Sequence, residues 1–251
     1  MAKTLIQAHR GASAYAPENT LPAFQMAVDM GADGIECDIH LTRDGQFVVC
    51  HDETVNRTSD GTGSIAGKTL AELKALDFGV KFDPRFAGTR IPTLEEMLDV
   101  VGGMRVINIE IKRFDHPMGQ ETASDRFYEL LKNKNVLSRT IVSSFDEKAL
   151  KVLKQRHPDT VTCLLYSGGR NKCETADKLH CSAIHPDFSR LTAAEIAKAH
   201  EKGMMVNCWT PNSQEDIRRQ ILAGCDGIIT NYPDRALKLV KESAQNENGS
   251  L

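Results

Sequence analysis

The chain has 251 residues, of which 41% are hydrophobic and 26% are charged, a composition that excludes a mainly disordered protein. Its 31 lysines and arginines are balanced by 34 aspartates and glutamates, which gives a net charge of −3. Binding to nucleic acid or to an anionic membrane calls for a surplus of positive charge. We therefore expect no nucleic-acid partner and no stable membrane association.

The N-terminal segment MAKTLIQAHRGASAY lacks the apolar run of a signal peptide, and no apolar stretch approaches the roughly 18 residues of a membrane span. These features predict a cytoplasmic protein. The 7 cysteines cannot all pair, and none belongs to a C-x-x-C motif. We interpret them as reduced thiols in the core.

Short runs rich in valine, isoleucine and other apolar residues recur along the chain, and each predicts a β-strand. They begin at Thr4, Gly34, Val106, Thr140, Thr160, Ala183, Met204 and Gly227. The segments between them have helical spacing, as Leu21, Phe24 and Val28 illustrate. Eight strands that alternate with helices in a chain of this length predict a closed (β/α)8 TIM barrel rather than an open doubly wound sheet.

The second strand–helix unit is unusually long. The last four units repeat every 20 to 23 residues, whereas the second extends from Gly34 to the next strand at Val106. Its turn-rich middle predicts a small insertion between strand 2 and helix 2, over about residues 52–92, on the face of the barrel where active sites are built. We expect residues 1–251 to form a single domain that contains this insertion.

Ionisable residues lie near the ends of the first three predicted strands and just beyond the second, where apolar side chains are the rule. They are His9, Arg10, Glu36, Asp38, His51, Glu110 and Lys112. Because side chains on a strand alternate between its faces, Glu36 and Asp38 project together, and so do Glu110 and Lys112. Both pairs can therefore point into the barrel.

Three carboxylates at the mouth of a barrel repel one another unless a cation lies among them. An all-oxygen set selects a hard ion, so Glu36, Asp38 and Glu110 predict one divalent cation, either Mg²⁺ or Ca²⁺. Zinc would require histidine or thiolate ligands, and Cys37 faces the opposite side of its strand. The alternative is a buried carboxylate–lysine network that only holds the strands together.

His9 and His51 flank these carboxylates, and imidazole exchanges a proton near neutral pH. We therefore predict that they act as catalytic acid and base. Arg10 and Lys112 add fixed positive charge, which suits an anionic phosphate.

Trp209 either packs in the core or forms a wall of the substrate site. We assign the remaining histidines to structural positions: His40, His116, His157, His180, His185 and His200.

Several segments resemble the glycerophosphodiester phosphodiesterase family, in particular its cytosolic bacterial members. They are AHRGASAYAPENT from Ala8, GIECDIHLTRDGQFVVCHD from Gly34, VINIEIK from Val106, NCWTPN from Asn207 and GCDGIITNYPD from Gly224. The resemblance covers nearly the whole chain, and its first two motifs are long and specific. It implies a (β/α)8 barrel with a small insertion after the second strand.

The resemblance implies metal-dependent hydrolysis of a small-molecule glycerophosphodiester, such as a deacylated phospholipid, to glycerol 3-phosphate and an alcohol. The family motifs place the histidines of the site at His9 and His51, the phosphate-binding cations at Arg10 and Lys112, and the metal ligands at Glu36, Asp38 and Glu110. Phe145 and Trp209 fall where the family has aromatic residues near the substrate. One histidine is then expected to take a proton and the other to protonate the leaving alcohol. Whether water or a substrate hydroxyl attacks, and which histidine is the acid, stay open.

Two other functions are compatible with this barrel. A lysophospholipid-cleaving enzyme at a membrane would need an exposed apolar rim, and Phe78, Phe82 and Phe86, interleaved with Lys81 and Arg85, are the candidates. A non-catalytic barrel that only binds its ligand is disfavoured, because every ionisable position of the motifs is filled. Head-group preference and homodimerisation are left open.

Overall fold

A computed structural model describes residues 4–112, 116–169 and 172–248. Eight parallel strands form a closed barrel, because β1 pairs with β2 on one side and with β9 on the other. The described strands are β1 (Leu5–His9), β2 (Gly34–Leu41), β3 (Phe47–Val49), β4 (Val106–Ile111), β5 (Thr140–Ser144), β6 (Val161–Tyr166), β7 (Ala183–Pro186), β8 (Met205–Trp209) and β9 (Gly227–Thr230). The predicted barrel is confirmed, and each predicted strand begins within one residue of its observed start.

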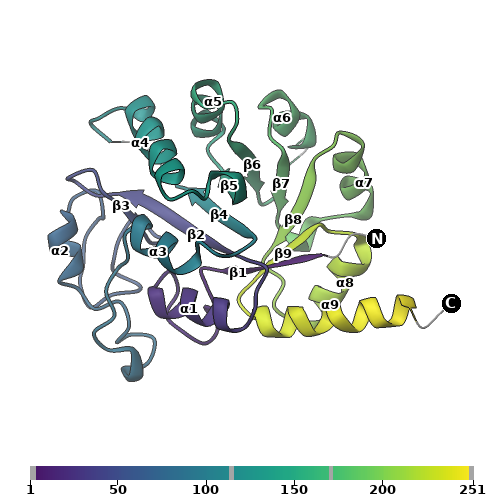
Figure 1. The fold of residues 1–251 in the computed structure, drawn as a ribbon, viewed down its shortest axis with the longest axis horizontal. Helices are drawn as coiled ribbons and strands as arrows, with labels where there is room; N and C mark the ends of the chain where they lie inside the picture. Colours follow the sequence, from purple (N-terminus) through teal and green to yellow (C-terminus); the bar gives the residue numbers. More distant parts are fainter. Residues whose placement is uncertain (1–3, 113–115, 170–171, 249–251) are drawn as a thin grey trace.

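Helices surround the barrel, as Figure 1 shows. The α-helices of the described chain are α1 (Leu21–Asp29), α2 (Leu70–Lys74), α3 (Leu94–Val101), α4 (Gln120–Asn133), α5 (Glu147–Arg156), α6 (Lys172–Lys178), α7 (Ala193–Glu201), α8 (Gln214–Ala223) and α9 (Pro233–Asn248). Short 3-10 turns add η1 (Pro84–Phe86), η2 (Leu137–Arg139) and η3 (Phe188–Arg190). None of the helices in the described ranges combines the length and apolar character of a membrane span.

Strand β3 was not predicted from the sequence. The chain turns back after β2 and pairs antiparallel with it, with Ile39 opposite Val49. The turn depends on Gly45, whose positive φ of 76° is strained for other residues, and on the Thr42 hydroxyl, which accepts a hydrogen bond from the amide of Gln46. This hairpin carries the chain from the barrel into the insertion.

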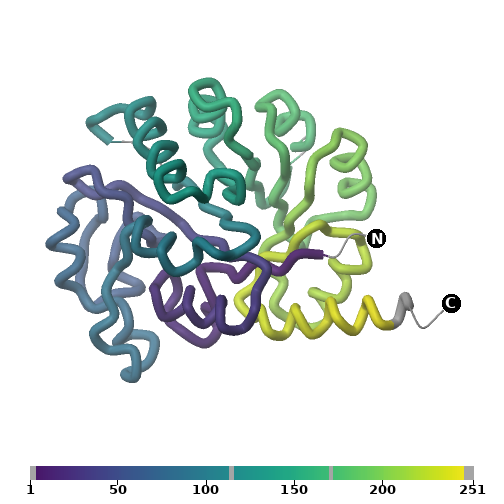
Figure 2. Tube along the Cα trace, viewed as in Figure 1, coloured from purple at the N-terminus to yellow at the C-terminus, as the bar shows by residue number. Residues whose placement is uncertain are grey.

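The insertion between β3 and α3 has a small core of its own. Its buried apolar side chains are Val48, Cys50, Val55, Ile65, Leu73, Phe78 and Ile91. Figure 2 shows this segment as a separate lobe at the left of the barrel. Helix α3 then begins with a capping box, in which Thr93 and Glu96 satisfy each other's backbone amides, and returns to the barrel as its second helix.

The apolar core lies mainly between the barrel and its helices. Ile35, Cys37 and Ile39 of β2 point outward into a cluster that also contains Phe24 of α1 and Phe127 of α4. The alternate residues of β2, Glu36 and Asp38, therefore face the barrel interior. That interior contains a buried polar layer beneath its mouth, formed by Gln7, Asn108, Ser143, His185 and Asn207.

We expect Phe24→Ala to lower the free energy of unfolding by about 3–5 kcal/mol, because a fully buried phenyl ring would leave a cavity. The matched control is Phe82→Ala on the insertion, where 44% of the side chain is already exposed and the loss should stay below about 1 kcal/mol. Urea unfolding followed by circular dichroism measures both. Equal losses would contradict this placement of the core.

Candidate active site

Strand register brings the predicted carboxylates together at one end of the barrel. His9 of β1 is the register partner of Glu36, and Asp38 of β2 is the partner of Glu110 on β4. Residues paired in this way point to the same face of a parallel sheet. Oxygens of Glu36, Asp38 and Glu110 consequently lie within 4.8 Å of one another, and all three residues are buried.

This crowding changes the proton affinity of each acid. Burial, together with the charges of Asp38 and Glu110, raises the pKa of Glu36 well above its usual value. Burial and the charge of Asp38 raise the pKa of Glu110 to about 7. Burial acts in the same direction on Asp38, but Lys112 and Arg10 hold its pKa well below the usual range. Glu36 and Glu110 thus bind a proton more tightly than a free carboxyl group does unless further positive charge arrives.

The two cations of the site contact the carboxylates directly. The Lys112 ammonium lies 2.8 Å from Asp38 Oδ1 and 2.5 Å from Glu110 Oε1. Arg10 Nε lies 3.5 Å from Asp38 Oδ2. These contacts form the carboxylate–lysine network expected as the alternative to a metal site, but the two positive charges are one short of the three negative charges that the carboxylates carry when all are ionised. An all-oxygen set with this deficit could hold a metal ion.

Backbone geometry at the end of β1 sets the position of Arg10. Its φ is 55°, in the left-handed region, and its amide donates to Glu36 Oε2 at 3.1 Å. Gly11 follows with φ 78°, and a Cβ at this position would lie 2.6 Å from the backbone carbonyl carbon of Ala23 in α1. The close approach of the loop to α1 therefore requires glycine here.

His9 and His51 both line the cavity beside the carboxylates and have different partners. His9 Nδ1 lies 2.6 Å from the side-chain oxygen of Asn231, and its Nε2 lies 3.8 Å from Glu36. His51 Nδ1 lies 2.7 Å from Asp52 Oδ1. Since each partner oxygen accepts a hydrogen bond, both rings carry their proton on Nδ1 and leave Nε2 for other contacts. Burial and the nearby Arg10 lower the pKa of His9 to about 4.

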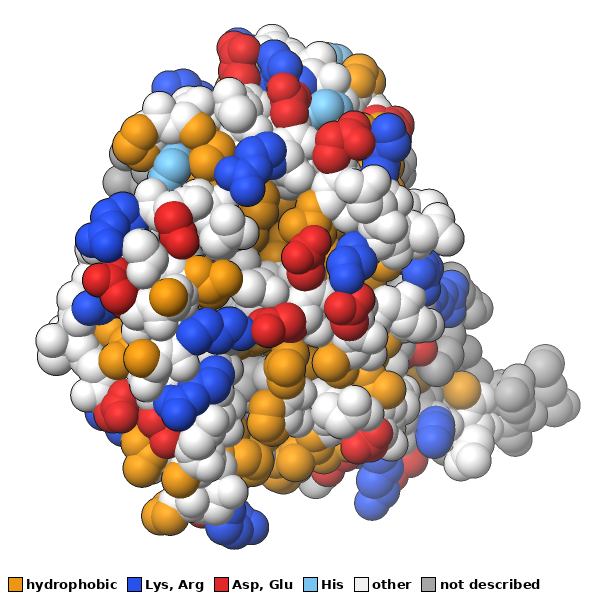
Figure 3. Space-filling view, turned by 60° about the vertical axis from the view of Figure 1, so that its left-hand side comes forward, with side chains coloured by type: hydrophobic (Ala, Val, Ile, Leu, Met, Phe, Trp, Pro, Cys, Tyr) orange, Lys and Arg blue, Asp and Glu red, His pale blue; other side chains and the backbone are white. Residues whose placement is uncertain are grey.

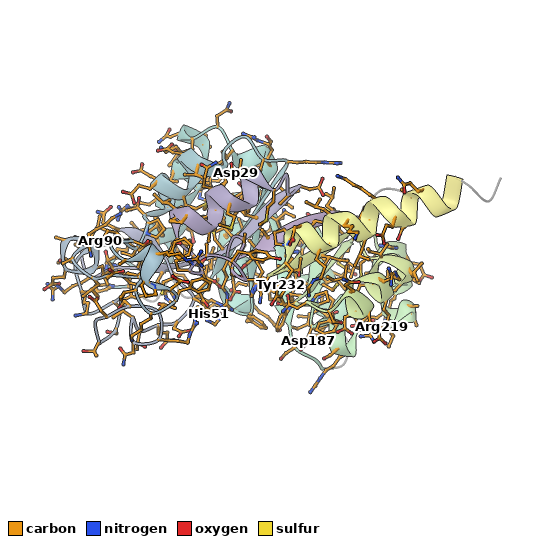
Figure 4. All side chains as sticks on the ribbon, turned by 90° about the horizontal axis from the view of Figure 1, so that it is seen from below. Asp29, His51, Arg90, Asp187, Arg219 and Tyr232 are labelled. Atoms are coloured by element: carbon orange, nitrogen blue, oxygen red, sulfur yellow. The ribbon has the colours of Figure 1, made fainter. Side chains whose placement is uncertain are left out.

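The hairpin explains how His51 reaches the site. The amide of Cys50 donates to the carbonyl of Asp38 at 2.9 Å, which places the end of β3 beside the carboxylates. His40, assigned to a structural position, contacts the carbonyl of His51 through Nε2 at 3.1 Å. In Figure 4, His51 lies between the insertion, which carries Arg90, and the C-terminal units, which carry Asp187 and Arg219.

A cavity of about 130 Å³ opens above the carboxylates. Eight of the nine predicted site residues line it, and Asp38 is buried beside them. One wall is charged, and the other is apolar, formed by Phe145, Leu165, Trp209 and Ile229. Phe145 and Trp209 meet edge to face at 5.8 Å between ring centroids, so Trp209 forms a wall of the cavity rather than only filling the core.

Several residues of the site were missed from the sequence. Asn108 and Ser143 form the floor of the cavity, and Asn19 donates to Asp38 Oδ2 at 2.8 Å. Asn231, Asp52 and Glu18 contact His9, His51 and Arg10 respectively, and Arg57 donates to both Asp52 and Glu18. Glu18 and Asn19 belong to the motif segment APENT, and Asn231 belongs to TNYP. Their place in these motifs could have marked them as site residues.

His185 lies fully buried below the cavity in the polar layer. The Asn207 amide lies 2.8 Å from its Nε2, and the indole of Trp209 donates to its carbonyl at 2.8 Å. Burial lowers the pKa of His185 to about 3. It therefore supports the wall of the cavity as a neutral group, in accordance with the structural assignment.

Comparison with known proteins identifies the family. Residues 9–235 match the model of the glycerophosphoryl diester phosphodiesterase family. The chain belongs to this family. A glycerophosphodiester phosphodiesterase of Caldanaerobacter subterraneus subsp. tengcongensis is 39% identical over 96% of this chain and 99% of that protein. One from Bacillus subtilis is 33% identical over 95% and 87% of the two chains.

Solved structures agree with this assignment. A putative phosphodiesterase of the family from Silicibacter pomeroyi has a TM-score of 0.87 at 25% identity, with 97% of this chain and 95% of that chain covered. An Oleispira antarctica phosphodiesterase, solved in complex with the product sn-glycerol-3-phosphate, has a TM-score of 0.86 at 28% identity and coverages of 95% and 97%. This chain is a phosphodiesterase of the same family and fold.

The buried His185 predicts a pH dependence of stability. Its folded-state pKa of about 3 lies below the unfolded value of 6.5, so only the unfolded phosphodiesterase takes up this proton between those values. Stability should therefore fall as the pH drops through this window. Between pH 7 and pH 4.5 the decrease in the free energy of unfolding should be about 2 kcal/mol smaller in His185→Gln than in the wild type.

Urea titrations at the two pH values measure this difference. His180→Asn is the control and should keep the wild-type pH dependence, since the side chain is exposed and asparagine tolerates the φ of 55° at this position. The same decrease in His185→Gln as in the wild type would show that His185 does not carry this effect.

Proposed function

We propose that this enzyme hydrolyses glycerophosphodiesters to glycerol 3-phosphate and a free alcohol, with one Mg²⁺ or Ca²⁺ ion bound by Glu36, Asp38 and Glu110. The observation that carries the proposal is the convergence of these carboxylates with two cations and two histidines on one cavity. The Oleispira antarctica neighbour, solved with sn-glycerol-3-phosphate, supports a small-molecule substrate of this class.

The residues fit a hard divalent cation. The donors are all carboxylate oxygens, and they are already close together on two adjacent strands. Burial and mutual repulsion raise the pKa values of Glu36 and Glu110, and a bound cation would stabilise their ionised forms. When bound, such an ion supplies Lewis-acid polarisation of substrate oxygens. Asn19 and Lys112 hold the Asp38 carboxylate from two sides, so its orientation is set by neighbouring side chains.

Arg10 and Lys112 bind the phosphate in this proposal. Both line the cavity next to the carboxylates, and their side chains are only 18% and 16% exposed. Fixed cations in a site that is largely shielded from water stabilise negative charge on phosphoryl oxygens as it grows in the transition state. The carboxylates keep these cations in place before the substrate arrives.

His9 and His51 act as acid and base. Each has Nδ1 bound to an oxygen, so each offers Nε2 for proton transfer. One imidazole takes the proton of the attacking water or substrate hydroxyl as its oxygen bonds to phosphorus, and the other protonates the alcohol oxygen as its bond to phosphorus breaks. If a substrate hydroxyl attacks, water then opens the cyclic phosphate to give glycerol 3-phosphate. Phe145 and Trp209 contact the substrate from the apolar wall.

The lysophospholipid alternative receives limited support. Phe78 is buried in the core of the insertion, so it cannot contribute to an apolar rim. Phe82 is 44% exposed and Val80 is 40% exposed, and they leave a small apolar patch beside Lys81. Figure 3 shows positive and negative side chains interspersed over this side of the molecule, without a field of one sign. We therefore retain the soluble diester as the substrate class.

The remaining predictions concern the setting of the enzyme. All seven cysteines are free and buried, which supports a reducing compartment such as the cytoplasm. A single domain with an insertion at about residues 52–92 and the absence of nucleic-acid and stable membrane partners stay predictions, and homodimerisation stays open.

Metal removal tests the carboxylate site. We expect release of glycerol 3-phosphate from glycerophosphocholine or glycerophosphoethanolamine to stop after chelation and to return with Mg²⁺ or Ca²⁺, because the carboxylates repel one another without a cation. An enzyme-coupled assay for glycerol 3-phosphate measures it. Full activity in the chelated enzyme would contradict metal dependence. Cleavage of lysophosphatidylcholine in place of both diesters would support the membrane alternative.

Alanine at either histidine tests the acid and base. We expect His9→Ala and His51→Ala each to lower kcat by about 10²-fold or more, the contribution of a positioned acid or base, without loss of the fold. His157→Ala is the matched control, because His157 stacks on Tyr128 at the C-terminal end of α5. Near-normal turnover in either site variant would remove that histidine from the mechanism.

A further inference from the structure

Arg57 of the insertion lies between two carboxylates that in turn hold residues of the catalytic cavity. Its Nε and Nη2 donate to Asp52 at 2.7 and 3.1 Å, and its Nη1 and Nη2 donate to Glu18 at 2.8 and 2.7 Å. Asp52 contacts His51 Nδ1 at 2.7 Å, and Glu18 accepts from Arg10 Nη1 at 2.9 Å. An unbroken chain of charged hydrogen bonds thus connects His51 to Arg10 through Arg57.

We propose that Arg57 is a positioning residue, which orients His51 through Asp52 and Arg10 through Glu18. This inference rests on the proposed function of His51 and Arg10. It also gives the insertion a part in catalysis, because Arg57 belongs to that segment while Arg10 and Glu18 lie in the loop after β1.

Three observations favour positioning over substrate binding. Arg57 does not line the catalytic cavity; it lines a neighbouring groove with Glu18, Lys81 and Phe82. Its positive charge is already matched by Asp52 and Glu18. Its donors are used in two bidentate pairs, a geometry that the planar guanidinium provides and a lysine ammonium does not.

The contacts are better suited to orienting side chains than to stabilising the fold. The Arg57, Asp52 and Glu18 side chains are 48%, 30% and 21% exposed. Ion pairs at such exposure contribute little to stability. A displacement of about 1 Å in a catalytic group, by contrast, can cost 10²-fold in rate. Loss of Arg57 should therefore reduce turnover far more than it reduces thermal stability.

The two arms of the chain predict different kinetic effects. Asp52 acts on His51, so Asp52→Asn should mainly lower kcat. Glu18 acts on Arg10, which holds the phosphate both in the bound substrate and in the transition state, so Glu18→Gln should raise KM as well as lower kcat. Arg57→Met affects both, and its effect should be smaller in the Asp52→Asn background than in the wild type, because the His51 arm is then already broken.

The experiment compares Arg57→Met and Arg57→Lys with the wild type and with Arg85→Met. Arg85 is the matched control, since it belongs to the same insertion and pairs with Asp83 on the surface. We expect both Arg57 variants to lose about 10- to 100-fold in kcat at nearly unchanged Tm and unchanged metal binding by calorimetry. Arg85→Met should behave as the wild type.

Two further readouts separate positioning from a general structural role. Millimolar guanidinium should partly restore kcat of Arg57→Ala, and it should not do so for His51→Ala. Nitrogen-15 NMR of the histidine side chains should show His51 protonated on Nδ1 in the wild type and a mixture of tautomers in Arg57→Met. This NMR readout needs no turnover, so it tests the proposal even if the wild type cleaves no glycerophosphodiester and the proposed function fails.

Turnover in Arg57→Met within twofold of the wild type, with an unchanged His51 tautomer, would overturn the proposal. So would a loss of activity that is matched by a comparable loss of Tm or metal affinity, since Arg57 would then act on the fold or on the metal site. Full activity in Arg57→Lys would show that the positive charge alone is sufficient. It would contradict the inference that positioning depends on the bidentate contacts of the guanidinium group.

Discussion

Burying Glu36, Asp38 and Glu110 together costs free energy, because each negative charge loses its water and repels the other two. The surroundings offset this cost only in part. Lys112 and Arg10 contact Asp38 and keep it ionised, while burial and the neighbouring carboxylates raise the pKa values of Glu36 and Glu110. A site with this deficit of positive charge is suited to accept a divalent cation and an anionic phosphate together. Loop residues hold several of these charged groups, as Asn19 does for Asp38 and Glu18 does for Arg10.

The hairpin of β2 and β3 returns the chain to the mouth of the barrel. A barrel strand delivers side chains to the mouth only at its own end, and β2 already supplies Glu36 and Asp38 there. By turning back through Gly45 and pairing again with β2, the chain brings His51 beside Asp38 and only then departs into the insertion. The insertion packs its own small core, so it can present side chains to the site from a folded segment.

The predictable part of the protein was the part governed by local patterns. Alternating strands and helices of regular length predicted the barrel, and period-two alternation predicted that Glu36, Asp38 and Glu110 face inward while Cys37 faces outward. The family resemblance added Phe145 and favoured the substrate site for Trp209, and these two residues, far apart in the chain, meet on one wall of the cavity. Strand β3 was missed because three residues carry too little periodicity to separate a strand from a loop.

The sequence by itself determined the fold class and the residue types of the site, because strand alternation and helix spacing are short-range properties of the chain. Only the tertiary structure decided how these residues are held. Asn231 reaches His9 across 222 positions, and Arg57 reaches Glu18 across 39. Such contacts depend on which loops meet at the mouth of the closed barrel, and no local pattern encodes that meeting. In the closed barrel, the neutral His185 lies beneath the cavity, and Trp209, which donates to its carbonyl, lines the cavity wall.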